Sequence, residues 1–187
     1  TPSFTVYDDN DSAVIVTKAL PTIKKRDAGI AAHKIALAKD YCLSPDDDLS
    51  EIDTDENFAQ TYRAYQNRLR TTGNADFGDL IMLPVRVMEK NPQIRAQMRR
   101  RFRVIMVDEY QDSNIAQFKL LQMLAGLDED SGTYVCVVGD DDQSIYRFRG
   151  AEVQNILNFA KVFPSTDIIK LESNYRSTAR ILAAADA

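Results

Sequence analysis

The feature that most constrains the fold of this 187-residue chain is a short apolar run that ends abruptly in two acids. The run is Val-Ile-Met-Val at residues 104–107, and Asp108 and Glu109 follow it directly. Such a run is typical of a buried strand in a parallel sheet. Parallel α/β proteins bind their ligands beyond the carboxyl ends of the strands. The two carboxylates are therefore expected at a ligand-binding edge.

Strand and helix patterns alternate after residue 102. Strands are predicted at 104–107, 134–138 and 168–171, and helices at 114–125, 152–163 and 177–185. This alternation favours an α/β fold in which crossover helices connect the strands of a parallel sheet.

The first hundred residues carry helical patterns only. In one of them, apolar side chains recur at i, i+4, i+7 and i+11 and so share one helix face: Phe58, Tyr62, Tyr65 and Leu69. The predicted organisation is an all-helical subdomain at residues 1–76, followed by the unit that contains the sheet at residues 77–187.

Composition excludes several classes of protein. Apolar residues at 44% and charged residues at 27% are ordinary globular values. The formal net charge of −5 excludes a basic coat over the whole surface, so any contact with nucleic acid must be local. No apolar stretch approaches the roughly 18 residues of a membrane span. Two widely separated cysteines, Cys42 and Cys136, argue against a disulfide framework and fit a reducing cytoplasm.

The acids at 108 and 109 suit the chemistry of a nucleotide hydrolase. One carboxylate at this edge can hold Mg²⁺ directly or through water, and its neighbour can orient or deprotonate an attacking water. An apolar run followed by Asp108 and Glu109 is, by itself, equally compatible with a solvated acidic loop that caps the next helix. The full string Asp-Glu-Tyr-Gln-Asp-Ser-Asn at residues 108–114 is more specific.

A second cluster follows the predicted strand at 134–138. Gly139 permits a tight exit from that strand, and the amide of Gln143 can both donate and accept, as sensing a terminal phosphate and a water requires. Aromatic rings then alternate with cations at Tyr146, Arg147, Phe148 and Arg149. Single-stranded DNA is held in this way, through stacked bases and paired phosphates. The alternative is that both rings pack in the core, but the adjacent Gly-Asp-Asp-Asp-Gln-Ser run favours DNA.

A third cluster, Asn-Tyr-Arg-Ser at residues 174–177, lies at a predicted strand-to-helix turn. In this order and at this spacing, the three clusters resemble motifs II, III and IV of the UvrD/Rep/PcrA-type superfamily 1 DNA helicases. Phe-Gly-Asp-Leu at residues 77–80 resembles the Phe-Asp-Asp-Leu segment before motif II, with Gly78 in place of the usual acid. The resemblance implies that the sheet is a partial RecA-like lobe and that the helical front is its inserted subdomain.

The resemblance also implies roles in the use of ATP. Asp108 would coordinate Mg²⁺ and Glu109 would be the catalytic base. Gln143 would sense the γ-phosphate, Tyr175 would stack on adenine, and Arg176 would be an arginine finger that neutralises charge developing on the γ-phosphoryl group.

The residues that the resemblance implies for DNA binding are aromatic or basic: Phe77, Tyr146, Phe148 and Arg149. The family often has Trp at the position of Phe148. Phe keeps the stacking surface and loses the indole N–H, so a DNA contact is still expected there.

The function expected from these features is that of a piece of an ATP-dependent DNA helicase. The parent enzyme would translocate on single-stranded DNA, 3′ to 5′, and unwind duplexes at junctions in repair or replication. These residues contain no G-x-x-x-x-G-K-[ST] phosphate loop, so the chain alone is expected to be inactive and to need the remaining helicase domains. Without the strand that carries the loop, either self-association through the edge of residues 104–107 or a rearranged, locally loose sheet is expected, while the helical front stays well folded. Two alternatives remain: a non-hydrolysing DNA-binding or interaction module, and a recombination helicase of the AddA/RecB kind.

Overall fold

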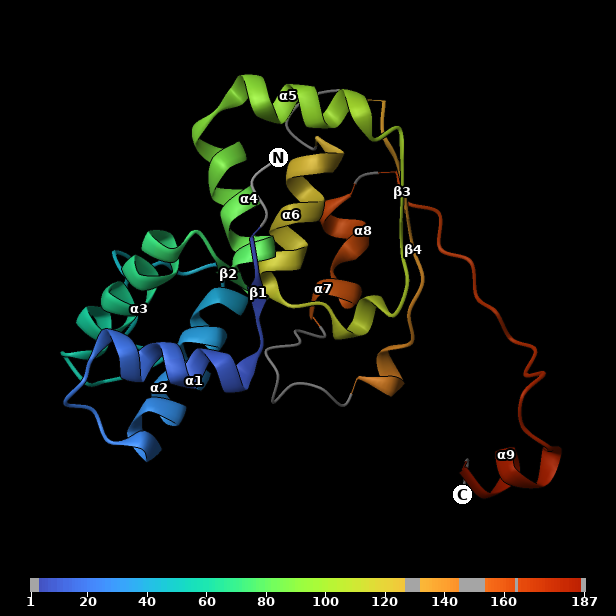
Figure 1. The fold of residues 1–187 in the computed structure, drawn as a ribbon. Coiled ribbons are helices and arrows are strands. Elements are labelled where there is room, and N and C mark those ends of the chain that lie inside the picture. Colours follow the sequence, from blue (N-terminus) through green and yellow to red (C-terminus); the bar gives the residue numbers. More distant parts are fainter. Residues whose placement is uncertain (1–3, 127–131, 145–153, 164, 186–187) are drawn as a thin grey trace.

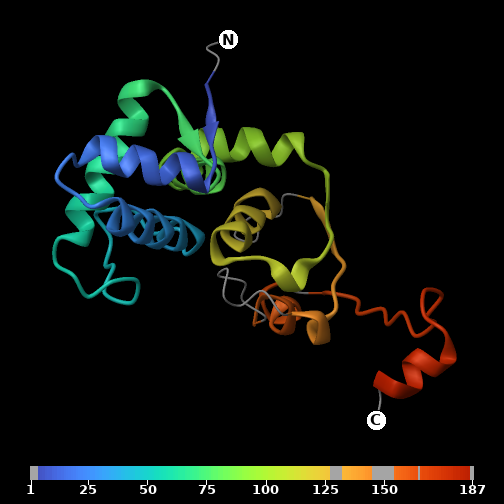
Figure 2. The same cartoon turned by 60° about the horizontal axis from the view of Figure 1, so that its bottom comes forward.

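The computed structural model describes residues 4–126, 132–144, 154–163 and 165–185. They form a helical front and an α/β unit, which lie side by side (Figures 1 and 2). The front consists of β1 (Val6–Tyr7), α1 (Asp9–Ala19), α2 (Lys25–Asp40), α3 (Phe58–Thr72) and β2 (Ala75–Asp76).

The remaining elements follow in chain order. They are α4 (Asp79–Lys90), α5 (Pro92–Arg101), β3 (Val104–Val107), the 3-10 turn η1 (Tyr110–Asp112), α6 (Ile115–Ala125), β4 (Tyr134–Val137), the 3-10 turn η2 (Asp141–Gln143), α7 (Gln154–Leu157), α8 (Phe159–Val162) and α9 (Ala179–Ala185). Among the residues described, no helix is both long enough and apolar enough to cross a membrane.

One apolar core holds the helical front together. The side chains that α3 buries in it lie on the single face that their spacing predicts: Phe58, Tyr62, Tyr65 and Leu69. Each large side chain buried in this way contributes roughly 1.5–3 kcal/mol. The front also contains a two-residue parallel ladder, with Val6 opposite Ala75 and Tyr7 opposite Asp76. Strands this short have no periodicity, so the sequence does not predict them.

The α/β unit contains the two strands predicted before residue 140. β3 and β4 pair in parallel, with Val104 opposite Tyr134 and Val107 opposite Val137. Helices α6, α7 and α8 lie along one side of these strands (Figure 1), where Ile105, Val107 and Val135 pack against a core that includes Phe159. The opposite face is open, and Met106 is 74% exposed there. The structure thus has the expected mixed α/β organisation with a parallel pair of strands.

Two predictions for the C-terminal third are wrong. Residues 168–171 form no strand, and Ile169 is 82% exposed, because this segment pairs with neither β3 nor β4. An apolar run becomes a strand only when its backbone groups find partners. The helix predicted at 152–163 is interrupted at Asn158, which separates α7 from α8.

Candidate functional site

The two acids emerge beside the loop that follows β4. The Val138 N–H donates to the Val107 carbonyl at 2.8 Å, and the Tyr110 N–H donates to the Val138 carbonyl at 2.9 Å. Because these bonds continue the β3–β4 pairing past the strand ends, the loops that follow both strands lie at one edge of the sheet. Asp108 and Glu109 are both exposed at this edge.

Glu109 has an unusual backbone conformation. Its φ of 50° and ψ of 40° lie in the left-handed region, which residues other than glycine rarely adopt. Its N–H is held by Asp108 Oδ1 at 2.9 Å, and its Oε2 accepts a hydrogen bond from Gln111 Nε2 at 2.7 Å. Strained conformations of this kind persist where neighbouring contacts hold them, and they cluster at functional sites. Both the backbone and the carboxylate of Glu109 are therefore fixed.

Gln111 connects the two loops. Its side chain is buried, and while Nε2 donates to Glu109, Oε1 accepts from the Asp140 N–H at 3.1 Å. A Cβ on Gly139 would lie 2.7 Å from Gln111 Oε1, so glycine at 139 is required by this close approach. Gln111 carries no pattern in the sequence that marks it as a site residue. Its only signal was its place two residues after Glu109 in the Asp-Glu-Tyr-Gln-Asp string.

Gln143 lies in the second loop at the end of η2. It is exposed, and its Nε2 donates to Asp140 Oδ2 at 2.6 Å. Since Asp140 is joined to Gln111, a chain of hydrogen bonds runs from Gln143 through Asp140 and Gln111 to Glu109. The structure thus brings three of the predicted ATP-site residues to one edge: Asp108, Glu109 and Gln143.

This edge fits Mg²⁺ in its chemistry. Carboxylate oxygens are hard ligands, and Mg²⁺ is usually bound by one or two protein carboxylates, with waters and substrate phosphates completing the shell. In the described part of the chain, no three His, Cys, Asp or Glu side chains gather into a metal cage. Asp108, with Glu109 beside it, fits an Mg²⁺ site that is built from one or two protein carboxylates.

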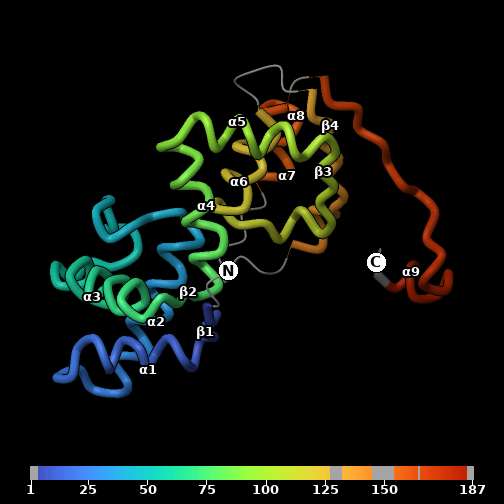
Figure 3. The backbone as a smooth tube through the Cα atoms, turned by 45° about the horizontal axis from the view of Figure 1, so that its top comes forward, coloured from blue at the N-terminus to red at the C-terminus, as the bar shows by residue number. Residues whose placement is uncertain are grey.

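Two other predicted ATP-site residues, Tyr175 and Arg176, lie away from this edge. Tyr175 is 95% exposed, and residues 165–185 extend away from the rest of the molecule (Figures 1 and 3), so Tyr175 and Arg176 are not brought to the strand edge. The turn that carries them is closed by Asn174 Oδ1, which accepts from the Arg176 N–H at 2.9 Å. Tyr146, Phe148 and Arg149 lie outside the described residues.

Phe77 is presented by a turn between β2 and α4. Its ring is 63% exposed, whereas Asp76 and Asp79 on either side of the turn are buried. Both acids are 2.6–2.8 Å from the amine of Lys39, at the C-terminal end of α2. Sequence reasoning missed these three charged residues. The available signal was that Lys39 lies four residues after the buried Ile35 and so shares its helix face.

The loop after Glu109 is also tied to α2. Asn114 caps α6 by accepting from the Gln117 N–H at 2.9 Å, and its Nδ2 donates to Asp40 Oδ1 at 2.7 Å. Burial raises the pKa of Asp40 to about 6, and this hydrogen bond opposes the rise. Adjacent residues of α2, Lys39 and Asp40, therefore contact the Phe77 turn and the segment that follows the acids.

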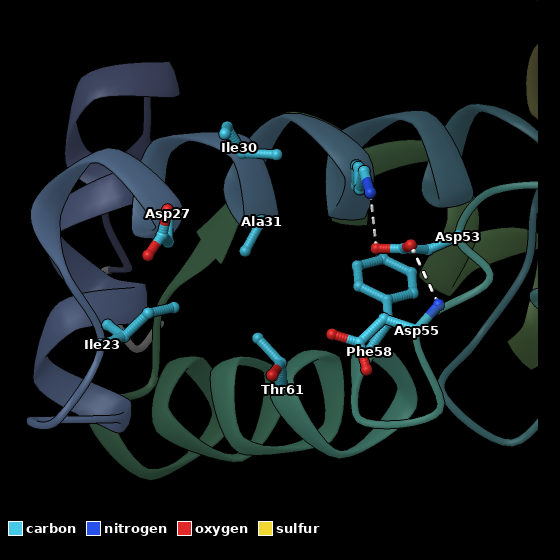
Figure 4. Close-up of a pocket in the computed structure, with 9 residues that line it drawn as sticks. Ile23, Asp27, Ile30, Ala31, Asp53, Asp55, Phe58 and Thr61 are labelled. Carbon is cyan, nitrogen blue, oxygen red and sulfur yellow. Dashed lines mark hydrogen bonds and ion pairs between the residues drawn. The ribbon is translucent and has the colours of Figure 1, made fainter.

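A separate small pocket of about 200 Å³ lies between α2 and α3 (Figure 4). Ile23, Ile30 and Phe58 supply its apolar wall. Its only described cation, Lys34, is 2.7 Å from Asp53 and is paired with it. None of the predicted site residues that the structure describes lines this pocket, so it is distinct from the strand edge.

The chain is similar to known DNA helicases along nearly its whole length. Residues 1–164 match the family described as the UvrD/REP helicase N-terminal domain. An ATP-dependent DNA helicase UvrD1 from Mycobacterium tuberculosis is 42% identical over 98% of this chain and 25% of its own length. The ATP-dependent DNA helicase PcrA of Bacillus subtilis is 38% identical over 98% of this chain and 25% of its own length. The ATP-dependent DNA helicase Rep of Escherichia coli is 34% identical over 98% of this chain and 28% of its own length.

The chain thus spans about a quarter of the length of the curated relatives that it matches. The family match includes the helical front, both strands, and the loops that carry Asp108, Glu109 and Gln143. The chain belongs to the UvrD/Rep family of helicases and corresponds to the N-terminal domain of that family.

Proposed function

We propose that this chain is part of an ATP-dependent DNA helicase and contributes one side of its ATP site. The observation that carries the proposal is the hydrogen-bonded edge at which Gln111 joins Glu109 to the Asp140 loop. Asp108 would hold the Mg²⁺ that accompanies ATP, where the ion neutralises phosphate charge. Gln143 would contact the γ-phosphate.

Glu109 would be the general base of hydrolysis. A base must be held within hydrogen-bonding distance of the water from which it takes a proton. Glu109 Oε2 is already engaged by Gln111, which leaves Oε1 to meet the water. The exposed position of the carboxylate gives water access to it.

For DNA, we propose that Phe77, Tyr146, Phe148 and Arg149 contact a single strand through stacked bases and paired phosphates. The protein would move 3′ to 5′ and separate duplexes at junctions during repair or replication, in the cytoplasm. Tyr175 would stack on adenine and Arg176 would be the arginine finger, once residues 165–185 pack against the remaining helicase domains.

We place the boundary between the two units at residue 76. The core of the front is built from residues between 15 and 69, and that of the α/β unit from residues between 105 and 163. A third, smaller cluster spans the boundary, because Cys42 packs with Met82 and Ala116. Two separate cores joined only by a small shared cluster support a division into two subdomains.

We also propose that the 187 residues alone do not hydrolyse ATP, because they contain no phosphate-loop motif. The backbone N–H groups and the Lys of such a loop cradle the phosphates, and electrostatic stabilisation of this kind dominates catalysis of phosphoryl transfer. This proposal would be contradicted if the purified chain released phosphate from ATP in the presence of magnesium and Glu109→Gln abolished that release.

The proposal is tested with Glu109→Gln in the longer protein that contains this chain. Gln has nearly the same shape but cannot accept the proton, so DNA-stimulated ATP hydrolysis should be lost while a fluorescent ATP analogue still binds. The matched control is Glu56→Gln, at an exposed position of the front. This variant should hydrolyse ATP as the wild type does. Substantial hydrolysis by Glu109→Gln would remove Glu109 from the role of base.

A further inference from the structure

Lys39 is a buried lysine with two buried acids as partners. It is 0% exposed, and its Nζ lies 2.6 Å from Asp76 Oδ2 and 2.8 Å from Asp79 Oδ1. Removing three charges from water is costly, and apolar side chains of similar volume often stabilise a fold as well or better. Stability is therefore a weak reason for this cluster, and holding one defined local geometry is the alternative role of such buried charges.

Aromatic and polar groups of α3 complete the surroundings of the cluster. The Tyr65 hydroxyl is 2.7 Å from Asp76 Oδ2, and Gln66 Nε2 donates to Asp79 Oδ1 at 2.8 Å. Lys39 Nζ lies 5.2 Å from the centre of the Tyr65 ring, within the range of a cation–π contact. Each carboxylate is thus held from two helices, α2 and α3.

The two acids are the ends of a four-residue turn. Asp76 closes it by accepting the Asp79 N–H at Oδ1, at 2.8 Å. Gly78 within the turn packs against the stem of Lys39, and a Cβ at 78 would lie 2.8 Å from both Lys39 Cβ and Cδ. The φ of −63° and ψ of −36° at Gly78 suit any residue, so close packing on Lys39, and not backbone conformation, requires glycine. Lys39 therefore fixes both ends of the turn by charge and its middle by contact.

The remaining residue of the turn is Phe77, which points outward and is 63% exposed. An exposed aromatic ring on a fixed turn can stack on a base without the entropic cost of ordering the turn. We propose that Lys39 is a positioning residue for DNA binding, which sets the turn so that the Phe77 ring stacks on a base of single-stranded DNA. This inference rests on the proposed function, since it assumes that the family's DNA strand passes Phe77.

A double-mutant cycle in the longer protein tests whether Lys39 acts through Phe77. The variants are Lys39→Met, Phe77→Ala and the pair, and the readout is the Kd for fluorescein-labelled oligo-dT at fixed salt. Phe77→Ala should raise Kd roughly 5- to 150-fold, the loss of one stacked base. Lys39→Met should raise Kd by no more than Phe77→Ala does. The double variant should bind oligo-dT no more weakly than Phe77→Ala alone. Losses that multiply in the pair would overturn the inference.

A second variant keeps all three charges, which guards against misfolding of Lys39→Met. Gly78→Ala should displace the turn from Lys39 and raise both Kd and the DNA concentration for half-maximal ATP hydrolysis, with kcat unchanged at saturating DNA. The matched control is Gly29→Ala in α2, where a Cβ meets nothing within 4 Å, and it should bind as wild type. Wild-type affinity in Gly78→Ala would overturn the inference.

The same measurements separate this inference from the proposed function. If the wild-type longer protein neither binds oligo-dT nor hydrolyses ATP in response to it, the proposed function fails and the inference fails with it. If DNA-stimulated hydrolysis is present and Phe77→Ala leaves Kd unchanged, the inference alone is refuted.

Discussion

Replacing Asp40 with Asn should stabilise the protein at neutral pH and have little effect in acid. Burial, with smaller contributions from the nearby charges of Asp76 and Asp9, raises the pKa of Asp40 from 3.8 to about 6. The folded state therefore binds this proton more tightly than the unfolded state does. The penalty is absent below about pH 4, where both states are protonated, and it is complete above about pH 6, where both are ionised.

The magnitude follows from the size of the rise. A difference of one pKa unit corresponds to about 1.4 kcal/mol, so a rise of roughly two units corresponds to about 3 kcal/mol at most. Asp40 is only partly buried, and solvent screening reduces this to about 1–2 kcal/mol. Asn at 40 retains an oxygen that can accept the hydrogen bond from Asn114 Nδ2, so the substitution removes the charge and leaves the contact.

The assay is urea unfolding of wild type and Asp40→Asn at pH 7.5 and near pH 4. The variant should be more stable by about 1–2 kcal/mol at pH 7.5, and this gain should shrink towards zero near pH 4. Asp167→Asn, at an exposed position in residues 165–185, is the control for a change in net charge. A gain of the same size at both pH values, or no gain at pH 7.5, would refute the assignment of the penalty to Asp40.

Two further predictions concern Gly139 and the edge of residues 104–107. Gly139→Ala should lower the free energy of unfolding by about 1–3 kcal/mol, typical of overpacking, because its Cβ would lie 2.7 Å from Gln111 Oε1 and 2.8 Å from Ile156 Cδ1; a urea midpoint unchanged from wild type would contradict this. The isolated chain should self-associate through the edge of residues 104–107, because β3 pairs only with β4 among the described residues and Met106 beside this edge is exposed. Met106→Glu should then make it monomeric in light scattering, whereas a wild-type chain already monomeric at the same concentration would exclude that edge.

The parts of the fold that were predicted correctly are those that carry a local pattern. Residues 104–107 were identified as a strand from four apolar residues, and Phe58 to Leu69 as a helix from their 3.6-residue period. Residues 168–171 carry three apolar residues and Lys170, and they form no strand. The difference lies in pairing, because the backbone of β3 meets β4 while residues 168–171 meet no strand among the described residues.

The candidate site could be predicted only for residues in the loops that follow predicted strands. Asp108 and Glu109 directly follow β3, and Gln143 lies in the loop after β4, so the rule that ligands bind at strand ends places them at one edge. Gln111 acquires its role through Asp140, 29 residues further along the chain. No local pattern distinguishes a glutamine that joins two loops from one on the surface, so this contact required the fold.

The contacts of Lys39 and Asp40 are a second case in which the role of a residue depends on the fold. A lysine followed by an aspartate near the end of a helix suggests a solvated terminus from sequence alone. In the fold, Lys39 holds the Phe77 turn by its acids, and Asp40 holds Asn114, which lies five residues after Glu109. Neighbouring residues at the end of α2 thus contact both the turn that carries the proposed DNA contact and the segment that follows the proposed base.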